Sequence, residues 1–436
     1  MKTLCLILCG DGIAGLILLA ALRPSIKIKN TVFSVYWIAP LLAALLLVAT
    51  GCVNAKEVFF ALTANTAINP LKILALFLSV TALSVFLDEA GFFEVLAYKT
   101  LTVAKNSQVQ LFNVLYATVS VLTVFTSNDI VVLTFTPFIC MFAKNAKINP
   151  LPFLIAEFCA ANTWSLLFVI GNPTNIYLAT SAGISFGEYF FVMALPALVG
   201  GLTAWLVLRL VFAKSLKQPL QPFCGAPPSP KNKFFITAGL IHLAACTILL
   251  AISSYIGLEM WYICLAFAAS LYLTCGIYCV AKKQKATPLL NTAKRIPYQL
   301  VPFVLSMFVI VLALNANGLT AQIAKLLSTN GKTDVFTFGA ASYLSCALLN
   351  NIPMSVLFAS VCETLPNSAP ALFACITGSD IGALLTPTCA LAGLMWTDLL
   401  KKYDNKIGWG KFILYCGGVS VVALAATLGV LFLVVR

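Results

Sequence analysis

The chain has 436 residues, of which 61% are hydrophobic and 9% charged, with a mean hydropathy of +0.99 and a formal net charge of +13. A soluble domain carries about 25% charged residues, so this composition excludes a water-soluble protein and indicates an all-α polytopic membrane protein. The basic residues are spread over loops rather than gathered in one patch, which points to membrane lipid and against nucleic acid as a partner.

Eight apolar runs of about 18–25 residues are long enough to cross a ~30 Å hydrocarbon layer. They cover residues 4–22, 32–53, 70–87, 189–212, 234–252, 259–280, 297–315 and 411–435. Two further stretches, 89–106 and 318–329, have apolar residues at helical spacing with polar residues between them, which predicts helices lying in the membrane interface.

A run of four polar residues, 126–129, interrupts another long apolar segment. A carboxylate there costs several kcal/mol unless it faces protein, water or an ion. Irregular backbone at that depth is tolerated only where it is buried in protein or lines a cavity. We therefore predict a re-entrant hairpin of two half-length helices, and a second hairpin in the other half of the chain. The tip residues are Ser127, Asn128 and Asp129 in the first hairpin and Asn350 and Asn351 in the second.

Residues 150–187 and 369–400 are apolar segments interrupted by polar clusters. About 12 residues, or ~18 Å of helix, precede the first interruption, which is a half-crossing. We predict two discontinuous helices, giving about ten transmembrane helices in all. The polar residues at the predicted breaks are Asn162, Asn172, Thr174 and Asn175 in the first and Ser379, Asp380 and Thr386 in the second.

The same order of elements occurs twice, which predicts repeats at 1–213 and 234–436 joined by a Pro-rich cytoplasmic linker at 214–233. If the basic loop at 23–29 is cytoplasmic, the later clusters of Lys and Arg fall on the same side. The two repeats are then inverted, and both termini are extracytoplasmic. The first hairpin opens to the cytoplasm and the second to the outside.

Inverted repeats with broken helices place substrate and ion sites near the bilayer midplane. Asp129 and Asp380 are the acids predicted at a tip or a break, where each binds a cation or proton or else caps a half-helix. The amides and hydroxyls at the same places either bind substrate or satisfy frayed backbone. Glu157 is a relay or a paired residue near the surface. Cys346 and Cys389 are soft ligands or simple packing residues.

Other chemistry has no support in the sequence. The 15 cysteines show no paired spacing, and the single histidine, His242, makes no metal site. Phosphate-binding loops and the motifs of metalloproteases and hydrolases do not occur. We therefore predict no cofactor, no bound metal and no enzymatic activity.

Five stretches resemble the arsenite efflux permeases of the ion transporter superfamily, which also holds sodium/proton antiporters and carboxylate carriers. They are LDEAGFFE at 87–94, FTSNDIVVLTFTP at 125–137, GISFGEY at 183–189, NNIP at 350–353 and GSDIGALLTPTCALAGLMW at 378–396. The resemblance implies export of trivalent arsenic or antimony driven by the proton gradient, sometimes assisted by a cytosolic ATPase.

The sequence departs from that family in two places. The permeases tend to have Gly-Ser where this chain has Cys389 and Ala390, and the motif GNPTN at 171–175 is typical of the wider superfamily. We predict a secondary transporter of the cell membrane that exports arsenite or antimonite by proton antiport, with Asp129 and Asp380 as coupling carboxylates. The alternatives are a sodium/proton antiporter, a carboxylate carrier, and a channel-like subunit of an ATP-driven pump.

Overall fold

The computed structural model describes residues 2–22, 25–28, 31–65, 69–103, 107–218, 232–253, 255–329 and 331–435. These residues form helices, apart from a two-stranded antiparallel hairpin near the N-terminus. The elements of the first half are α1 (Lys2–Leu22), β1 (Ser25–Ile28), β2 (Thr31–Ser34), α2 (Ile38–Ala49), α3 (Ala55–Thr63), α4 (Pro70–Glu89), α5 (Phe92–Val103), α6 (Gln108–Phe125), α7 (Asn128–Asn145), α8 (Leu151–Trp164), η1 (Val169–Gly171), α9 (Pro173–Ser181), α10 (Phe186–Val211) and α11 (Ala213–Leu216).

The second half repeats the helix order of the first from α4 to α10, here from α15 to α22. Its elements are α12 (Lys233–Ala251), α13 (Met260–Ala281), α14 (Thr287–Arg295), α15 (Leu300–Ala316), α16 (Leu319–Leu327), α17 (Asp334–Leu349), α18 (Asn351–Glu363), α19 (Ala369–Gly382), α20 (Leu391–Lys402), α21 (Trp409–Phe412), the π-helical turn η2 (Ile413–Gly417) and α22 (Gly418–Val434). The predicted linker at 214–233 lies mostly outside the described residues, so the repeat boundaries stay a prediction.

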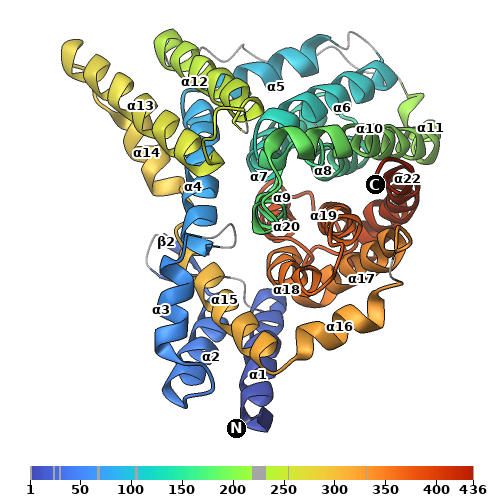
Figure 1. Cartoon of the computed structure of the whole chain (residues 1–436). Helices are drawn as coiled ribbons and strands as arrows, with labels where there is room; N and C mark the ends of the chain where they lie inside the picture. The colour runs from blue at the N-terminus through green and yellow to red at the C-terminus, as the bar shows by residue number, and fades with distance from the viewer. Residues whose placement is uncertain are drawn as a thin grey trace.

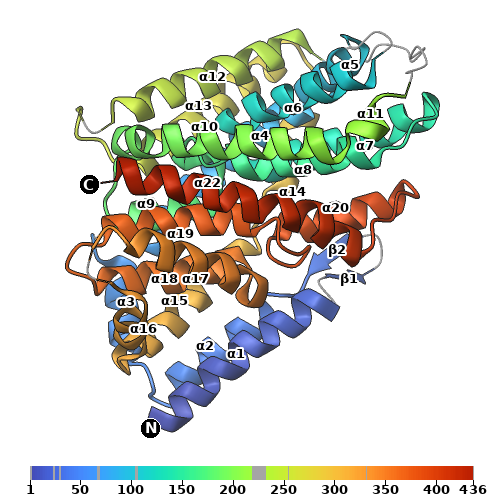
Figure 2. The ribbon, with the colours of Figure 1, turned by 90° about the vertical axis from the view of Figure 1, so that its right-hand side faces the viewer.

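Equivalent helices make equivalent contacts in the two halves. Hairpin α6–α7 packs on α8, the first segment of one broken helix, and hairpin α17–α18 packs on α19, the first segment of the other. Contacts between the halves are also exchanged, because α7 packs on α20 while α18 packs on α9. Figure 2 shows α5 at the upper right of the molecule and α16 at the lower left. This is the inverted-repeat architecture of a secondary transporter, as predicted.

Eight of the described helices are long and apolar enough to span a membrane. The predicted span at 32–53 is wrong: its first residues form β2, and α2 covers only the 12 residues Ile38–Ala49. The β-branched residues at the start of that run favour a strand, and β2 pairs with β1 over four residues. The apolar run therefore contains a strand followed by a short helix.

The hairpin arms are longer than predicted in the first repeat. Helices α6 and α7 each have 18 residues, or ~27 Å, which is close to a full crossing rather than half of one. The reason is that α6 begins directly after the capping residue Ser107 and α7 continues through the basic Lys144. Both arms therefore extend past the apolar stretch of the sequence into its polar flanks. In the second repeat, α17 and α18 have 16 and 13 residues.

Candidate functional site

The Asp380 carboxylate is the centre of a buried polar cluster that joins the two repeats. It lies on α19 with 0% exposure, and all its hydrogen-bond donors come from the first broken helix, 205 to 215 positions earlier in the chain. The donors are Ser165 Oγ and Asn175 Nδ2 to Oδ2, at 2.7 and 3.1 Å, and Asn172 Nδ2 and Thr174 Oγ1 to Oδ1, at 2.7 and 3.3 Å. Helices α9 and α19 meet near the middle of the molecule (Figure 1).

The donors around Asp380 carry no charge. None of the ion pairs formed by the described residues includes Asp380, so four neutral groups stabilise the carboxylate. Burying an ionised carboxylate without a cation is costly. One acceptor beside it is unsatisfied, because the buried Asn175 Oδ1 has no hydrogen-bond partner in the described part of the chain. The cluster therefore has capacity for a proton, a cation or a solute that donates hydrogen bonds.

Local sequence explains how the donors reach Asp380. After Trp164 the first broken helix leaves α-helical geometry, and it resumes at Asn172, whose side chain accepts from the Thr174 N–H, while Pro173 occupies the first helical turn. Asn172, Thr174 and Asn175 thus occupy the cap and first turn of α9. This turn is where a half-helix presents unpaired N–H groups and a favourable dipole to an anion.

Asp380 and Asn162 occupy equivalent positions in the two repeats. Each is the twelfth residue of a 14-residue helix, α19 for Asp380 and α8 for Asn162. Asp380 therefore lies in the last turn of α19, and the second break begins after Gly382, later than the predicted polar cluster at 378–382. The fold places a carboxylate and an amide at matching points, and only the carboxylate can carry charge.

The first hairpin tip joins this cluster through α8. Asn128 Nδ2 donates to Asn162 Oδ1 at 3.1 Å, and Ser165 Oγ lies 3.1 Å from the Asn162 carbonyl as well as contacting Asp380. Asp129, in contrast, is half-buried, and its backbone N–H donates to Asn128 Oδ1. The structure thus brings Asn128 and Asn162 next to the Asp380 cluster, whereas the Asp129 side chain makes no hydrogen bond within the described residues.

The second hairpin tip is tied to the second break. Asn350 has φ 72° and ψ 155°, a conformation nearly restricted to glycine. Its side chain donates to the Thr388 carbonyl at 2.9 Å, and the Asn351 N–H donates to the Cys389 carbonyl at 2.7 Å. These two bonds fasten the strained tip to the second break.

Four hydroxyl groups connect the hairpin tips to the helix breaks or lie within a break. Ser379 reaches the second tip through Ser355, which lies 3.3 Å away and donates to the Asn351 carbonyl. Thr386 stays within the second break, with its hydroxyl 3.1 Å from Cys389 Sγ. Sequence reasoning missed Ser165 and Ser355 as site residues. Ser165 belongs to the same polar stretch as Asn162, and Ser355 follows Asn351 by one helical turn, so both spacings were a usable signal.

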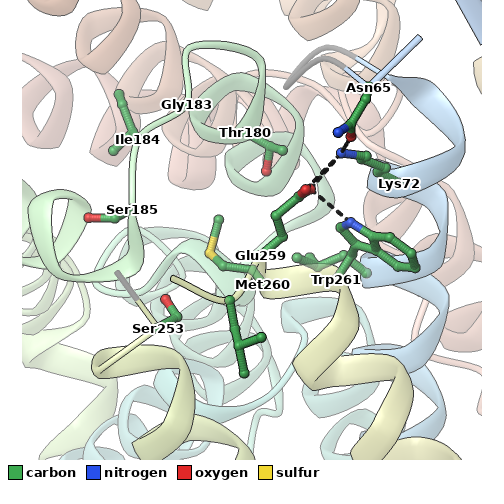
Figure 3. A pocket seen from close by; sticks show the side chains of 12 residues that line it. Asn65, Lys72, Thr180, Gly183, Ile184, Ser185, Ser253, Glu259, Met260 and Trp261 are labelled. Atoms are coloured by element: carbon green, nitrogen blue, oxygen red, sulfur yellow. Dashed lines mark hydrogen bonds and ion pairs between the residues drawn. The ribbon is translucent and has the colours of Figure 1, made fainter. Parts of the chain in front are cut away.

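Two pockets are lined by residues of α4 and α9. A cavity of about 20 Å³, enough for roughly one water molecule, is lined by Thr174, Tyr177 and Phe77. One to two turns further along the same helices, a larger pocket of about 350 Å³ is lined by Lys72 and Thr180. Figure 3 shows this pocket and the contacts inside it.

The larger pocket contains an ion pair. Glu259 Oε2 lies 2.7 Å from Lys72 Nζ and accepts from Trp261 Nε1 at 2.9 Å (Figure 3). The hydrogen bond from the Lys72 ammonium holds the pKa of the Glu259 carboxyl below its usual range. The pair joins the start of α4 to the start of α13 across the pocket.

Comparison with known proteins agrees with this architecture. The sequence profile of the citrate transporter family (CitMHS) matches residues 32–378. The arsenical pump membrane protein of Escherichia coli (strain K12) is 27% identical over 356 residues, covering 78% of this chain and 80% of that protein. The protein of the same name from Yersinia enterocolitica is 27% identical over 397 residues, covering 87% and 89%.

Two solved structures share the fold. The YdaH transporter of Alcanivorax borkumensis has a TM-score of 0.56 at 13% identity, covering 99% of this chain and 97% of that one. MtrF of Neisseria gonorrhoeae has a TM-score of 0.53 at 17% identity, covering 99% and 94%. The profile covers well over half of the sequence, and the repeated hairpins and broken helices are those of a secondary transporter. The chain therefore belongs to the citrate transporter (CitMHS) family.

Proposed function

We propose that this transporter exports arsenite or antimonite in exchange for protons, with Asp380 and Asp129 as the coupling carboxylates. The observation that carries the proposal is the fully buried Asp380 carboxylate, held by four neutral donors from the opposite repeat with an unsatisfied amide oxygen beside it. The ligands proposed for the solute are the tip and break residues. They are Ser127, Asn128, Asn162, Asn172, Thr174, Asn175, Asn350, Asn351, Ser379 and Thr386.

The charge of the cluster favours a neutral or cationic solute over an anion. A citrate-like anion would lie against the buried Asp380 carboxylate and be repelled by it. None of the ion pairs among the described residues brings a lysine or arginine to Asp380 to offset this repulsion. Arsenite at neutral pH is mainly an uncharged trihydroxide, whose O–H groups can donate to Asp380 and to Asn175 Oδ1. The relatives named arsenical pump membrane proteins support the same solute.

A sodium/proton antiporter is the second candidate. Carboxylate, hydroxyl and amide oxygens are the ligands that hard cations prefer, and Asp380, Ser165 and Asn175 supply all three kinds within one cluster. A sodium ion would also compensate the buried charge directly. Arsenite and sodium must therefore be compared in the same experiment.

Proton exchange gives an uncharged solute a driving force. Moving one charge across 100 mV is worth about 2.3 kcal/mol, which corresponds to roughly a 50-fold accumulation. In this proposal the chain spans the cell membrane with both termini outside. A carboxylate that binds a proton in one conformation and the solute in the other then couples the two fluxes.

The test is solute uptake by purified protein in liposomes with an imposed pH gradient and no ATPase. We expect arsenite to accumulate in an acidic lumen and to leave again when a protonophore collapses the gradient. Sodium and citrate are measured in parallel. Sodium exchange without arsenite uptake would favour the second candidate, and arsenite uptake that requires an added ATPase and ATP would identify a pump subunit.

Replacing Asp129 with asparagine tests the second coupling carboxylate. The side chain is half-buried at the first hairpin tip and makes no hydrogen bond within the described residues, so the change leaves the hydrogen-bonded cluster intact. We expect normal folding with a loss of uphill transport and of its pH dependence, measured as arsenite accumulation at several pH values. Uphill export with an unchanged pH profile would make Asp129 a structural residue and leave the coupling role to Asp380.

A further inference from the structure

Glu157 is a second fully buried carboxyl group that the proposed transport cycle does not yet use. It lies on α8 with 0% exposure, five residues before Asn162. Its hydrogen-bond partner is Thr136 on the hairpin arm α7, whose Oγ1 lies 3.0 Å from both Glu157 oxygens. None of the ion pairs among the described residues includes it. The environment is therefore neutral.

Thr136 can serve both protonation states of Glu157. Thr136 Oγ1 also lies 2.7 Å from the Val132 carbonyl oxygen, an acceptor that has no proton to give. A hydroxyl group has a single proton and can also accept a hydrogen bond. Thr136 Oγ1 therefore accepts from a protonated Glu157 while its own proton is donated to the Val132 carbonyl, and it donates to an ionised Glu157 when the hydroxyl turns. Without a cation beside it, the buried group avoids the cost of a buried charge as the uncharged carboxylic acid.

The second repeat shows that the fold does not need an acid here. Glu157 is the seventh residue of α8, and the seventh residue of α19 is Cys375, which is also fully buried. A cysteine fills this position as a small apolar side chain. A carboxyl group at the same depth costs desolvation in its charged form and gains nothing in packing. Its presence in the first repeat alone points to a role in proton handling.

We propose that Glu157 is a proton-binding site of the transport cycle, protonated in this buried conformation with Thr136 as its hydrogen-bond partner and emptied when α7 moves relative to α8. This inference rests on the proposed proton coupling. When the proton leaves, Trp396 on α20 is a candidate donor to the carboxylate. Its indole N–H is fully buried and has no hydrogen-bond acceptor among the described residues. Trp396 stacks on Phe158, the neighbour of Glu157, with ring centroids 4.8 Å apart.

Most titratable groups on the elements packed around Glu157 have other partners. On α7 the Cys140 thiol is the one that interacts electrostatically with Glu157. The titratable groups of the other packed elements are engaged elsewhere. Tyr116 on α6 donates to the Gly201 carbonyl of α10, Cys416 of η2 lies beside Cys159, and Asp380 on α19 is held by the first break.

Infrared difference spectroscopy of the reconstituted protein tests the proton directly. We expect a carboxylic-acid C=O band that disappears in Glu157→Gln and in Glu157→Cys, the residue type of the second repeat, while Asp398→Asn at the surface keeps it. The band does not depend on which solute is transported. Its absence from the wild-type spectrum at neutral pH would overturn the assignment of a proton to Glu157.

Transport measurements then test the coupling role. Both variants are expected to fold and to equilibrate arsenite, with the accumulation ratio falling to about one and the pH profile becoming flat, because a neutral side chain carries no proton across. If Glu157→Gln and Glu157→Cys keep wild-type accumulation and pH profile, Glu157 is a structural acid. If the wild type moves no arsenite, the proposed function fails, and the infrared band still decides the protonation of Glu157.

Discussion

Replacing Asp380 with asparagine is expected to abolish uphill transport, lowering solute accumulation to about one from roughly 50-fold at a pH gradient equivalent to about 100 mV. The carboxylate accepts from an amide on each oxygen, Asn172 on Oδ1 and Asn175 on Oδ2. An asparagine amide therefore places its NH₂ group against another NH₂ group in either orientation, at a cost of about 1–3 kcal/mol. The neutral side chain also cannot take up and release a proton.

The measurement is arsenite accumulation in liposomes under a fixed pH gradient, together with size-exclusion chromatography to confirm folding. The matched control is Asp398→Asn, since the Asp398 side chain is 48% exposed and is paired with Lys401 at 2.8 Å. The control is expected to transport normally. Wild-type accumulation by Asp380→Asn would remove Asp380 from the coupling mechanism and would leave the buried cluster as a purely structural contact between the repeats.

Replacing Gly378 with alanine is expected to destabilise the protein by more than about 2 kcal/mol through overpacking. A Cβ atom there would lie 2.0 Å from Ser342 Oγ and 2.8 Å from both the Gly339 carbonyl oxygen and the Tyr343 nitrogen. The Ser342 side chain can rotate, but the backbone atoms of α17 cannot move away without separating α17 from α19. Small residues at such crossings let helix backbones approach closely in a membrane.

Thermal unfolding in detergent measures this effect, and Gly429→Ala in α22 is the matched control because a Cβ atom there meets nothing within 4 Å. The control is expected to unfold at the wild-type temperature or slightly above, since alanine favours helix. We expect Gly378→Ala to unfold several degrees lower and to lose transport with the fold. An unchanged unfolding temperature would show that α17 and α19 tolerate separation at this crossing.

The local part of the fold could be predicted from the sequence. Polar residues 126–129 and 350–351 interrupt apolar runs, and the cost of exposed backbone in lipid leaves few conformations for such a break. Both hairpins and both broken helices follow from that cost. The run at 32–53 was misjudged because hydropathy measures apolar length and does not distinguish a strand followed by a helix from one continuous helix.

The partners within the site were decided by tertiary structure. The sequence predicted polar positions near helix breaks for Asp380 and Asn172, although Asp380 lies in the last turn of α19. Nothing local shows that the two meet across 208 positions, because the contact depends on how the inverted repeats pack. The same holds for the exclusion of Asp129 from the cluster and for the contact between Thr136 and Glu157. Hydropathy and turn chemistry act over a few residues, whereas the pairing of buried polar groups is fixed by the helix–helix packing that removes them from lipid and water.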